Sequence, residues 1–226
     1  MAPTPLFALM SIINPIIISY LIGCFPSALI IVYLFTGKDV RSGGSGNMGA
    51  LNTLRTVKKE KKNTILALLA FLIVFALDVG KGILAVNLFK NNPVLATFFV
   101  ILGHNYPIFL KFSGGRGAAT LMGVILYYQP KMLLVYLFTI VVFMYLTEII
   151  IFTIKKSKTR FPSFSHIVSE QILGRLIGEV FVLIPIYIFN RQLFLPVLVG
   201  TILVLIRHRD RLKKQYEKIN SPKIRR

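Results

Sequence analysis

Long apolar runs alternate with short polar and basic segments along the whole chain. A membrane-spanning helix needs about 20 predominantly apolar residues, and four of the runs reach that length. The seven predicted membrane segments are residues 15–35, 65–89, 94–102, 118–128, 133–154, 167–189 and 193–206. The pattern therefore predicts an all-α fold: a polytopic membrane helix bundle of about seven transmembrane segments, forming a single integral membrane domain over residues 1–226.

Two of these segments, residues 94–102 and 118–128, are too short for a full span and flank a glycine-rich stretch. Irregular backbone at membrane depth is tolerated only where protein covers it or where it lines a wet cavity. We therefore expect short or broken helices there, beside a binding site.

Composition agrees with a membrane protein. The chain is 55% hydrophobic and its mean hydropathy is +0.71, whereas soluble domains are about 45–50% apolar. Cys24 is the single cysteine, so an intramolecular disulfide and a cysteine metal cluster are excluded. The sequence predicts no metal site and no cofactor.

The formal net charge of +19 lies mainly between the apolar runs. Seven Lys and Arg residues fall in residues 38–62, four in residues 155–160 and nine in residues 207–226. The positive-inside rule places such segments in the cytoplasm. We expect an outside N-terminus, a basic cytoplasmic C-terminal tail over residues 207–226, and attraction to anionic membrane lipids rather than to nucleic acid.

Residues 43–55, the first glycine segment, alternate glycines with short polar side chains. Gly44 and Gly46 permit a tight turn, and Arg55 presents a planar fork that suits phosphate. The polar groups nearby are those of Ser45, Asn47 and Asn52. A flexible basic loop is the alternative reading of this pattern.

Residues 103–117, the second glycine segment, end in Gly114-Gly115-Arg116-Gly117 before an apolar run. Backbone N–H groups at the start of a helix favour an anion. His104 stands at the start of the segment, where both a structural hydrogen bond and a catalytic role are open. Both glycine segments and the basic C-terminal region are expected on one side of the membrane, where they can converge on one site.

Two charged pairs lie within the predicted spans. Asp78 and Lys81 are three residues apart and share a helix face, so we expect them to pair, since an unpaired charge is costly in a membrane. A structural role and a substrate contact both remain open for this pair. Arg175 and Glu179 are four apart and are expected to pair without taking part in chemistry.

The order of these motifs resembles a known family. The motifs are Gly-Ser-Gly-Asn-x-Gly-Ala-x-Asn-x-x-Arg at residues 44–55, Asp-x-x-Lys-Gly at 78–82, Gly-His-x-x-Pro-x-Phe-x-x-Phe-x-Gly-Gly-x-Gly at 103–117, and Arg-His at 207–208. Together they are similar to the bacterial glycerol-3-phosphate acyltransferases that use acyl phosphate, the PlsY family. Arg116 stands where that family usually carries lysine, and Arg211 where it usually carries asparagine.

The resemblance implies transfer of a fatty acyl group from acyl phosphate to glycerol 3-phosphate. The products would be lysophosphatidic acid and phosphate, in phospholipid synthesis at the bacterial cell membrane, with no metal or thioester carrier. It assigns catalysis to Ser45, Arg55 and His208. It makes Gly114, Gly115 and Gly117 a phosphate cradle, and from the residues themselves we further expect substrate binding by Gly44, Gly46, Asn47, Asn52, Lys81, His104 and Arg116.

Two other functions remain open on the sequence. One is a divergent paralogue that keeps the phosphate site without this turnover, or that only binds phosphate or lipid headgroups. A transporter predicts an internal repeat and polar residues at the membrane midplane.

Overall fold

The computed structural model describes residues 5–154 and 161–220, and this part of the chain folds into helices without a strand. The helices are α1 (Pro5–Cys24), α2 (Ser27–Thr36), η1 (Val40–Ser42), α3 (Ala50–Lys61), α4 (Thr64–Leu88), α5 (Pro93–Asn105), η2 (Ile108–Leu110), α6 (Ala118–Tyr128), α7 (Pro130–Ile154), α8 (Phe164–Glu170), α9 (Ile172–Phe181), α10 (Leu183–Phe189) and α11 (Arg191–Asn220).

Within residues 5–154 and 161–220, six stretches of helix are long and apolar enough to cross a membrane, and the short apolar α6 is a seventh segment. The prediction of an all-α polytopic membrane bundle with short helices is therefore confirmed. The two segments predicted to be short are α5, with 13 residues, and α6, with 11 residues.

Two of the predicted spans are broken into two or more helices in the described residues. The span expected at residues 15–35 divides at Phe25 and Pro26, because proline has no N–H to continue the hydrogen-bond ladder of α1. The span expected at 167–189 contains α9, α10 and the end of α8, with extended backbone at Gln171 between α8 and α9.

Two polar regions of the chain are helical in the structure. The basic segment 38–62, in which the hydropathy pattern predicts no span, contains α3, whose buried face includes Thr53 and Val57 and whose last turn is basic. Residues 207–220, in the predicted basic C-terminal tail, continue α11 as helix, and their cytoplasmic location stays a prediction. The basic segment 155–160 and residues 221–226 lie outside the described residues.

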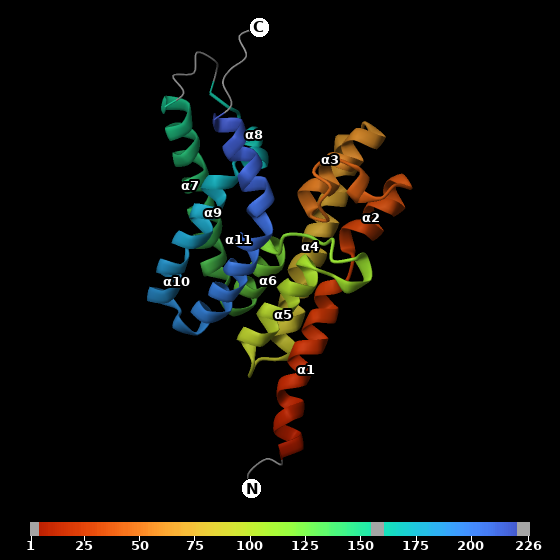
Figure 1. The fold of residues 1–226 in the computed structure, drawn as a ribbon, viewed down its shortest axis with the longest axis vertical. Coiled ribbons are helices and arrows are strands. Elements are labelled where there is room, and N and C mark those ends of the chain that lie inside the picture. The colour runs from red at the N-terminus through yellow and green to blue at the C-terminus, as the bar shows by residue number, and fades with distance from the viewer. Residues whose placement is uncertain (1–4, 155–160, 221–226) are drawn as a thin grey trace.

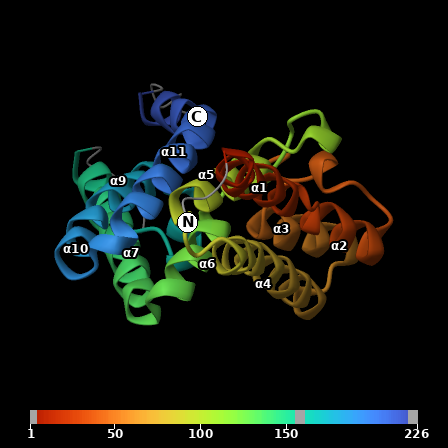
Figure 2. The same ribbon diagram turned by 90° about the horizontal axis from the view of Figure 1, so that it is seen from below.

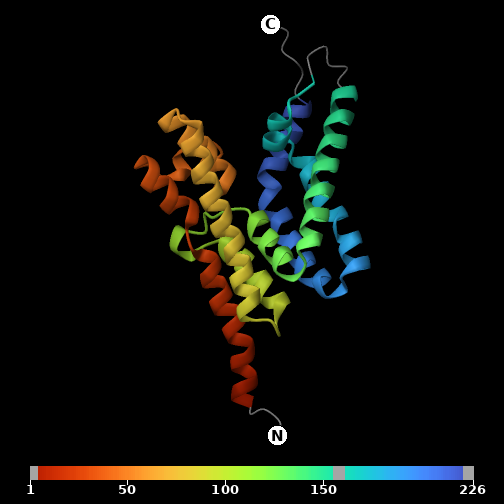
Figure 3. The same ribbon diagram turned by 180° about the vertical axis from the view of Figure 1, so that it is seen from behind.

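The helices form two groups with α6 between them. Helices α1 to α5 make one group and α7 to α11 the other, as Figures 1 and 2 show from two directions and Figure 3 from behind. Helix α6 packs on α4 of the first group and on α7 of the second.

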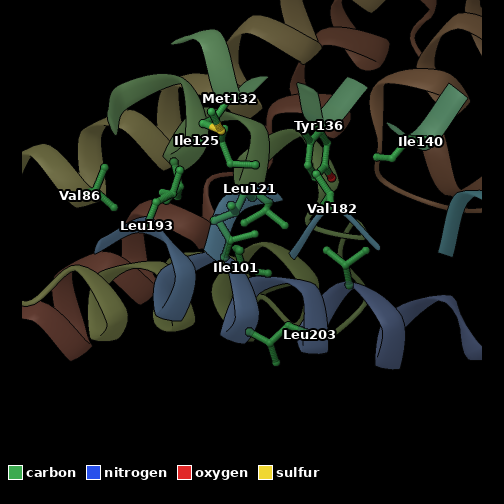
Figure 4. Packing of buried hydrophobic residues seen from close by; sticks show 14 of the residues in the cluster. Val86, Ile101, Leu121, Ile125, Met132, Tyr136, Ile140, Val182, Leu193 and Leu203 are labelled. Carbon is green, nitrogen blue, oxygen red and sulfur yellow. The ribbon is translucent and has the colours of Figure 1, made fainter. Parts of the chain in front are cut away.

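Two buried apolar clusters pack the described helices together, and the larger one includes residues of both groups. The smaller cluster joins α2, α3 and the first half of α4, and includes Val32, Val57 and Val74. The larger cluster joins α6 to α5 and the second group; Ile101 and Leu121 are two of the side chains that Figure 4 shows inside it.

Glycines bring α4 and α6 into close contact. A Cβ at Gly82 would lie 2.1 Å from the carbonyl oxygen of Thr120, and a Cβ at Gly123 would lie 2.0 Å from that of Val79. In a bilayer, helices associate through such close backbone packing rather than through a hydrophobic driving force. This contact therefore sets how α4, which carries Asp78, sits against the start of α6.

Candidate active site

The first glycine segment folds around the side chain of Asn52. Its Oδ1 accepts hydrogen bonds from Ser45 N (2.7 Å) and Ser45 Oγ (3.2 Å), and its Nδ2 donates to the carbonyls of Val40 (2.9 Å) and Gly43 (3.1 Å). Gly44 adopts a φ of +55°, and a Cβ there would lie 2.2 Å from Asn52 Oδ1. Asn52 is buried, so it holds Ser45 in place, with both ends of its amide engaged by the protein.

The second glycine segment is held from two sides. Within the segment, Gly114 N donates to the carbonyl of Asn105 (3.2 Å) and Gly115 N donates to that of His104 (2.9 Å). From α11, Arg207 Nε donates to Gly115 O (3.1 Å) and Nη2 to Gly114 O (3.3 Å).

These bonds correct one expectation. The N–H groups of Gly114 and Gly115 are engaged within the segment, so they do not face an anion. Helix α6 does begin directly after Gly117, which has a φ of +79°. The N–H groups of its first turn have no partner within the helix, and Gly117, Ala118 and Ala119 line a cavity.

A buried polar cluster lies behind the second glycine segment. Lys81 Nζ donates to Asp78 Oδ1 (2.8 Å) and to Ser27 Oγ (3.1 Å), and Ser27 Oγ donates to Asp78 Oδ1 (2.5 Å). The expected pairing of Asp78 and Lys81 is thus confirmed. Lys81 does not line the cavity described below, whereas Asp78 does.

His104 connects this cluster to the second glycine segment. Its Nδ1 lies 3.7 Å from Asp78 Oδ1. Its ring packs so closely on the backbone of Gly115 that a Cβ there would lie 2.0 Å from His104 Nε2. This placement favours the positioning role that the sequence left open for His104, although the residue also lines the cavity.

Two cavities adjoin between the helix groups. One, of about 550 Å³, is lined by polar and charged residues of the two glycine segments, of α11 and of the end of α8. The other, of about 360 Å³, continues inward to apolar side chains, among them Phe71, Phe75, Leu137 and Met144. The residues that line both are Ser45, Asn47, Arg55, Arg116 and Arg211. The predicted convergence of both glycine segments and the C-terminal basic region on one site is confirmed.

The shared wall of the cavities is strongly cationic. Arg55 comes from α3, Arg116 from the second glycine segment and Arg211 from α11. Burial, followed by repulsion from Arg211, lowers the pKa of Arg116 to about 9. A guanidinium stays protonated near neutral pH, so a bound anion would relieve both the burial cost and the repulsion.

His208 faces the inner cavity from α11 and is buried. Its Nδ1 lies 2.8 Å from the carbonyl oxygen of Val204. A carbonyl can only accept, so Nδ1 carries the proton, and in the neutral ring Nε2 is then the free acceptor. The local geometry of α11 therefore leaves one imidazole nitrogen available as a base or hydrogen-bond acceptor.

Arg175 and Glu179, which sequence reasoning left without chemistry, also line the inner cavity. Their expected mutual ion pair is wrong: Arg175 Nη2 donates to the carbonyl of Val168 (2.5 Å), and Glu179 Oε1 accepts from Tyr136 Oη (2.6 Å). Among the described residues, Glu179 Oε2 has no hydrogen-bond partner. The signal that could have found both residues is their position as charges within a predicted span.

No group of three or more His, Cys, Asp or Glu side chains in the described ranges is arranged to hold a metal ion. The wall shared by the two cavities instead carries the guanidinium groups of Arg55, Arg116 and Arg211, which suit anions.

The family model for glycerol-3-phosphate acyltransferase matches residues 13–218 of this chain. The chain belongs to this family. The glycerol-3-phosphate acyltransferase of Bacillus subtilis (strain 168) is 35% identical over 214 residues, covering 92% of this chain and 95% of the relative. That of Staphylococcus aureus (strain JH9) is 34% identical over 221 residues, covering 91% and 94%.

A solved member of the family has the same fold. The crystal structure of PlsY, an integral membrane glycerol 3-phosphate acyltransferase, in its glycerol 3-phosphate form matches with a TM-score of 0.60 and 25% identity, covering 93% of this chain and 94% of that one. The lysophosphatidic acid form matches in fold with a TM-score of 0.64 and 22% identity. The family membership makes this chain a multi-pass integral membrane acyltransferase, and the matched residues 13–218 include every expected site residue.

Proposed function

We propose that this chain transfers a fatty acyl group from acyl phosphate to glycerol 3-phosphate, releasing lysophosphatidic acid and inorganic phosphate. The observation that carries the proposal is the pair of adjoining cavities. The outer one suits a small phosphorylated acceptor, and the inner one has both a cationic wall and an apolar end. An amphiphile with a phosphate head and an alkyl chain matches the inner cavity in shape and polarity.

The residues divide the task between them. We assign phosphate binding to Arg55, Arg116 and Arg211, whose planar forks suit phosphate oxygens. Ser45 and Asn47 line both cavities and would contact the phosphate groups. Asn52 and His104 hold the two glycine segments in place, and Phe71 and Phe75 would contact the acyl chain.

The reaction forms one bond and breaks one. The acceptor hydroxyl oxygen attacks the acyl carbon, the bond from that carbon to the phosphate oxygen breaks, and its electron pair leaves with the phosphate. The hydroxyl proton passes to His208 Nε2 or to the departing phosphate. Because acyl phosphate already carries a good leaving group, holding the two anions close and stabilising the developing charge accounts for most of the work.

The direct test is phosphate release by the purified protein in bilayers. Palmitoyl phosphate and glycerol 3-phosphate are supplied together and separately, and the lipid product is identified by mass spectrometry. Release that needs both substrates, yields lysophosphatidic acid and is lost in Arg55→Ala supports the proposal. Folded protein without acceptor-dependent release contradicts it.

We also infer that the protein lies in a bacterial cell membrane with its N-terminus outside and its C-terminus in the cytoplasm. The charge distribution and the bacterial relatives support this. Helix α3 and the C-terminal end of α11 lie toward the same end of the molecule, opposite the start of α1 (Figure 1). In cells that express the Lys59→Cys variant, an impermeant maleimide should label residue 59 only after lysis. Labelling in intact cells would show that the orientation is the reverse of the inferred one.

A further inference from the structure

A carboxylate stands among the cations of the outer cavity. Glu170 is the last residue of α8, and its Oε1 lies 3.0 Å from Arg55 Nη2. Arg55 belongs to α3 in the first helix group, whereas Glu170 belongs to the second. The ion pair therefore joins the two groups beside the cavity that we assign to the acceptor.

The backbone that carries Glu170 is firmly anchored. The next residue, Gln171, breaks the helix, and its Nε2 donates to Glu148 Oε2 on α7 (2.7 Å). Its Oε1 accepts from Gln215 Nε2 on α11 (2.6 Å), and Gln215 Oε1 accepts from Ile172 N (2.8 Å). These bonds keep the end of α8 in place, so the carboxylate of Glu170 stays within reach of Arg55.

A carboxylate and a phosphate monoester use the same guanidinium N–H groups, and both form charge-assisted hydrogen bonds with them. An N–H that points at Glu170 is therefore withheld from a phosphate. We propose that the Glu170 carboxylate competes with phosphate for the guanidinium of Arg55. This competition lowers the apparent affinity of the site for its phosphorylated acceptor until the acceptor displaces Glu170 from Arg55. That the displacing anion is glycerol 3-phosphate rests on the proposed function.

The size of the effect follows from the exposure of the pair. The side chains are 29% exposed for Arg55 and 45% for Glu170. A solvent-exposed ion pair favours its closed state by a factor of about 1.5 to 5. Because apparent affinity is reduced by the fraction of molecules that are competent to bind, removing the competitor should strengthen binding about two- to sixfold.

Glu170→Gln removes the charge and keeps the size of the side chain. Glu60→Gln is the matched control, since Glu60 also pairs with a cation, Lys38 (2.5 Å), and lies in the same helix as Arg55 but does not line either cavity. Two quantities are measured in bilayers: the dissociation constant of inorganic phosphate by calorimetry, and the KM for glycerol 3-phosphate from phosphate release.

Glu170→Gln should lower both quantities about two- to sixfold relative to wild type, Glu170→Ala should agree in direction, and Glu60→Gln should leave them unchanged. The gain should shrink in high salt, because the exposed pair is screened. An unchanged or weaker affinity in Glu170→Gln overturns the proposal, as does wild-type protein that binds no phosphate. If phosphate binds but acyl transfer is absent, the proposed function fails and the binding measurement still decides the role of Glu170.

Discussion

Asn52→Ala is the sharpest test of how the first glycine segment is built. The substitution removes all four hydrogen bonds of the amide, two accepted from Ser45 and two donated to the carbonyls of Val40 and Gly43. Since alanine is smaller than asparagine, the change adds no steric conflict. What it takes away is the support that holds Ser45 and the turn around it.

The magnitude follows from the hydrogen bonds. A net intramolecular hydrogen bond contributes about 0.5–1.5 kcal/mol, and two of the four bonds are long, at 3.1 and 3.2 Å. The ordered segment should therefore lose about 2–4 kcal/mol of local stability. If binding must restore that order, kcat/KM falls about 30- to 1000-fold, since 1.36 kcal/mol is a factor of ten in rate.

The assay is acceptor-dependent phosphate release together with thermal unfolding in detergent. Asn63→Ala is the control: Asn63 Oδ1 caps α4 by accepting from Leu66 N (3.0 Å), and the residue lines neither cavity. It should lose about 1 kcal/mol of stability and keep its activity. If Asn52→Ala retained kcat/KM within threefold of wild type, the claim that Asn52 organises the site would be wrong.

Three further substitutions test the packing, the second glycine segment and the buried carboxyl. Gly82→Ala should lower the free energy of unfolding by about 1–3 kcal/mol, because the new Cβ would lie 2.1 Å from a backbone oxygen on α6. A Cβ at Gly80 would have nothing within 4 Å, so Gly80→Ala should be neutral or stabilising. Equal unfolding midpoints for the two variants would contradict this. Arg207→Lys loses the fork that holds Gly114 and Gly115, so kcat/KM should fall about ten- to hundredfold; full activity would argue against the clamp. Glu179→Gln should unfold at the wild-type temperature or higher, because it removes a buried carboxylate whose second oxygen lacks a partner. Tyr136→Phe, which removes the hydrogen bond to Glu179, should lower the free energy of unfolding by about 1–2 kcal/mol. A strongly destabilised Glu179→Gln would show that the charge is needed.

The membrane architecture was readable from the sequence because it depends on local composition. The length of a span follows from the thickness of the bilayer, and the short apolar segments at residues 94–102 and 118–128 predicted the short helices α5 and α6. The pairing of Asp78 and Lys81 was equally local, since both lie on one face of one helix.

Helix α3 was missed for a different reason. Its mean composition is polar and basic, so a hydropathy criterion places it outside the membrane and gives no reason to make it helical. Its buried face, which includes Thr53 and Val57, is stabilised by packing on α4. The same limit applies to residues 207–220, which continue α11 beyond its apolar part.

The roles of individual site residues depended on long-range partners. The sequence left a structural role and a substrate contact open for Lys81, and the structure shows it bonded to Asp78 and Ser27. The N–H groups of Gly114 and Gly115 are bonded to the carbonyls of residues 105 and 104, while Gly114 still lines the outer cavity, so substrate contact by these residues stays a prediction. Arg175 was expected to pair with Glu179, but the side chain of Tyr136 on α7 is the actual partner of that carboxyl.

By itself, therefore, the sequence determined the helical membrane fold, the two glycine segments and their resemblance to an acyltransferase family. These depend on composition and on the order of motifs along the chain. Only the tertiary structure decided which arginines share a cavity wall, that Glu170 reaches Arg55 from another helix group, and that Asn52 and His104 support the site from behind. Such contacts join residues from 7 to 115 positions apart, and their geometry is set by helix packing that no local pattern encodes.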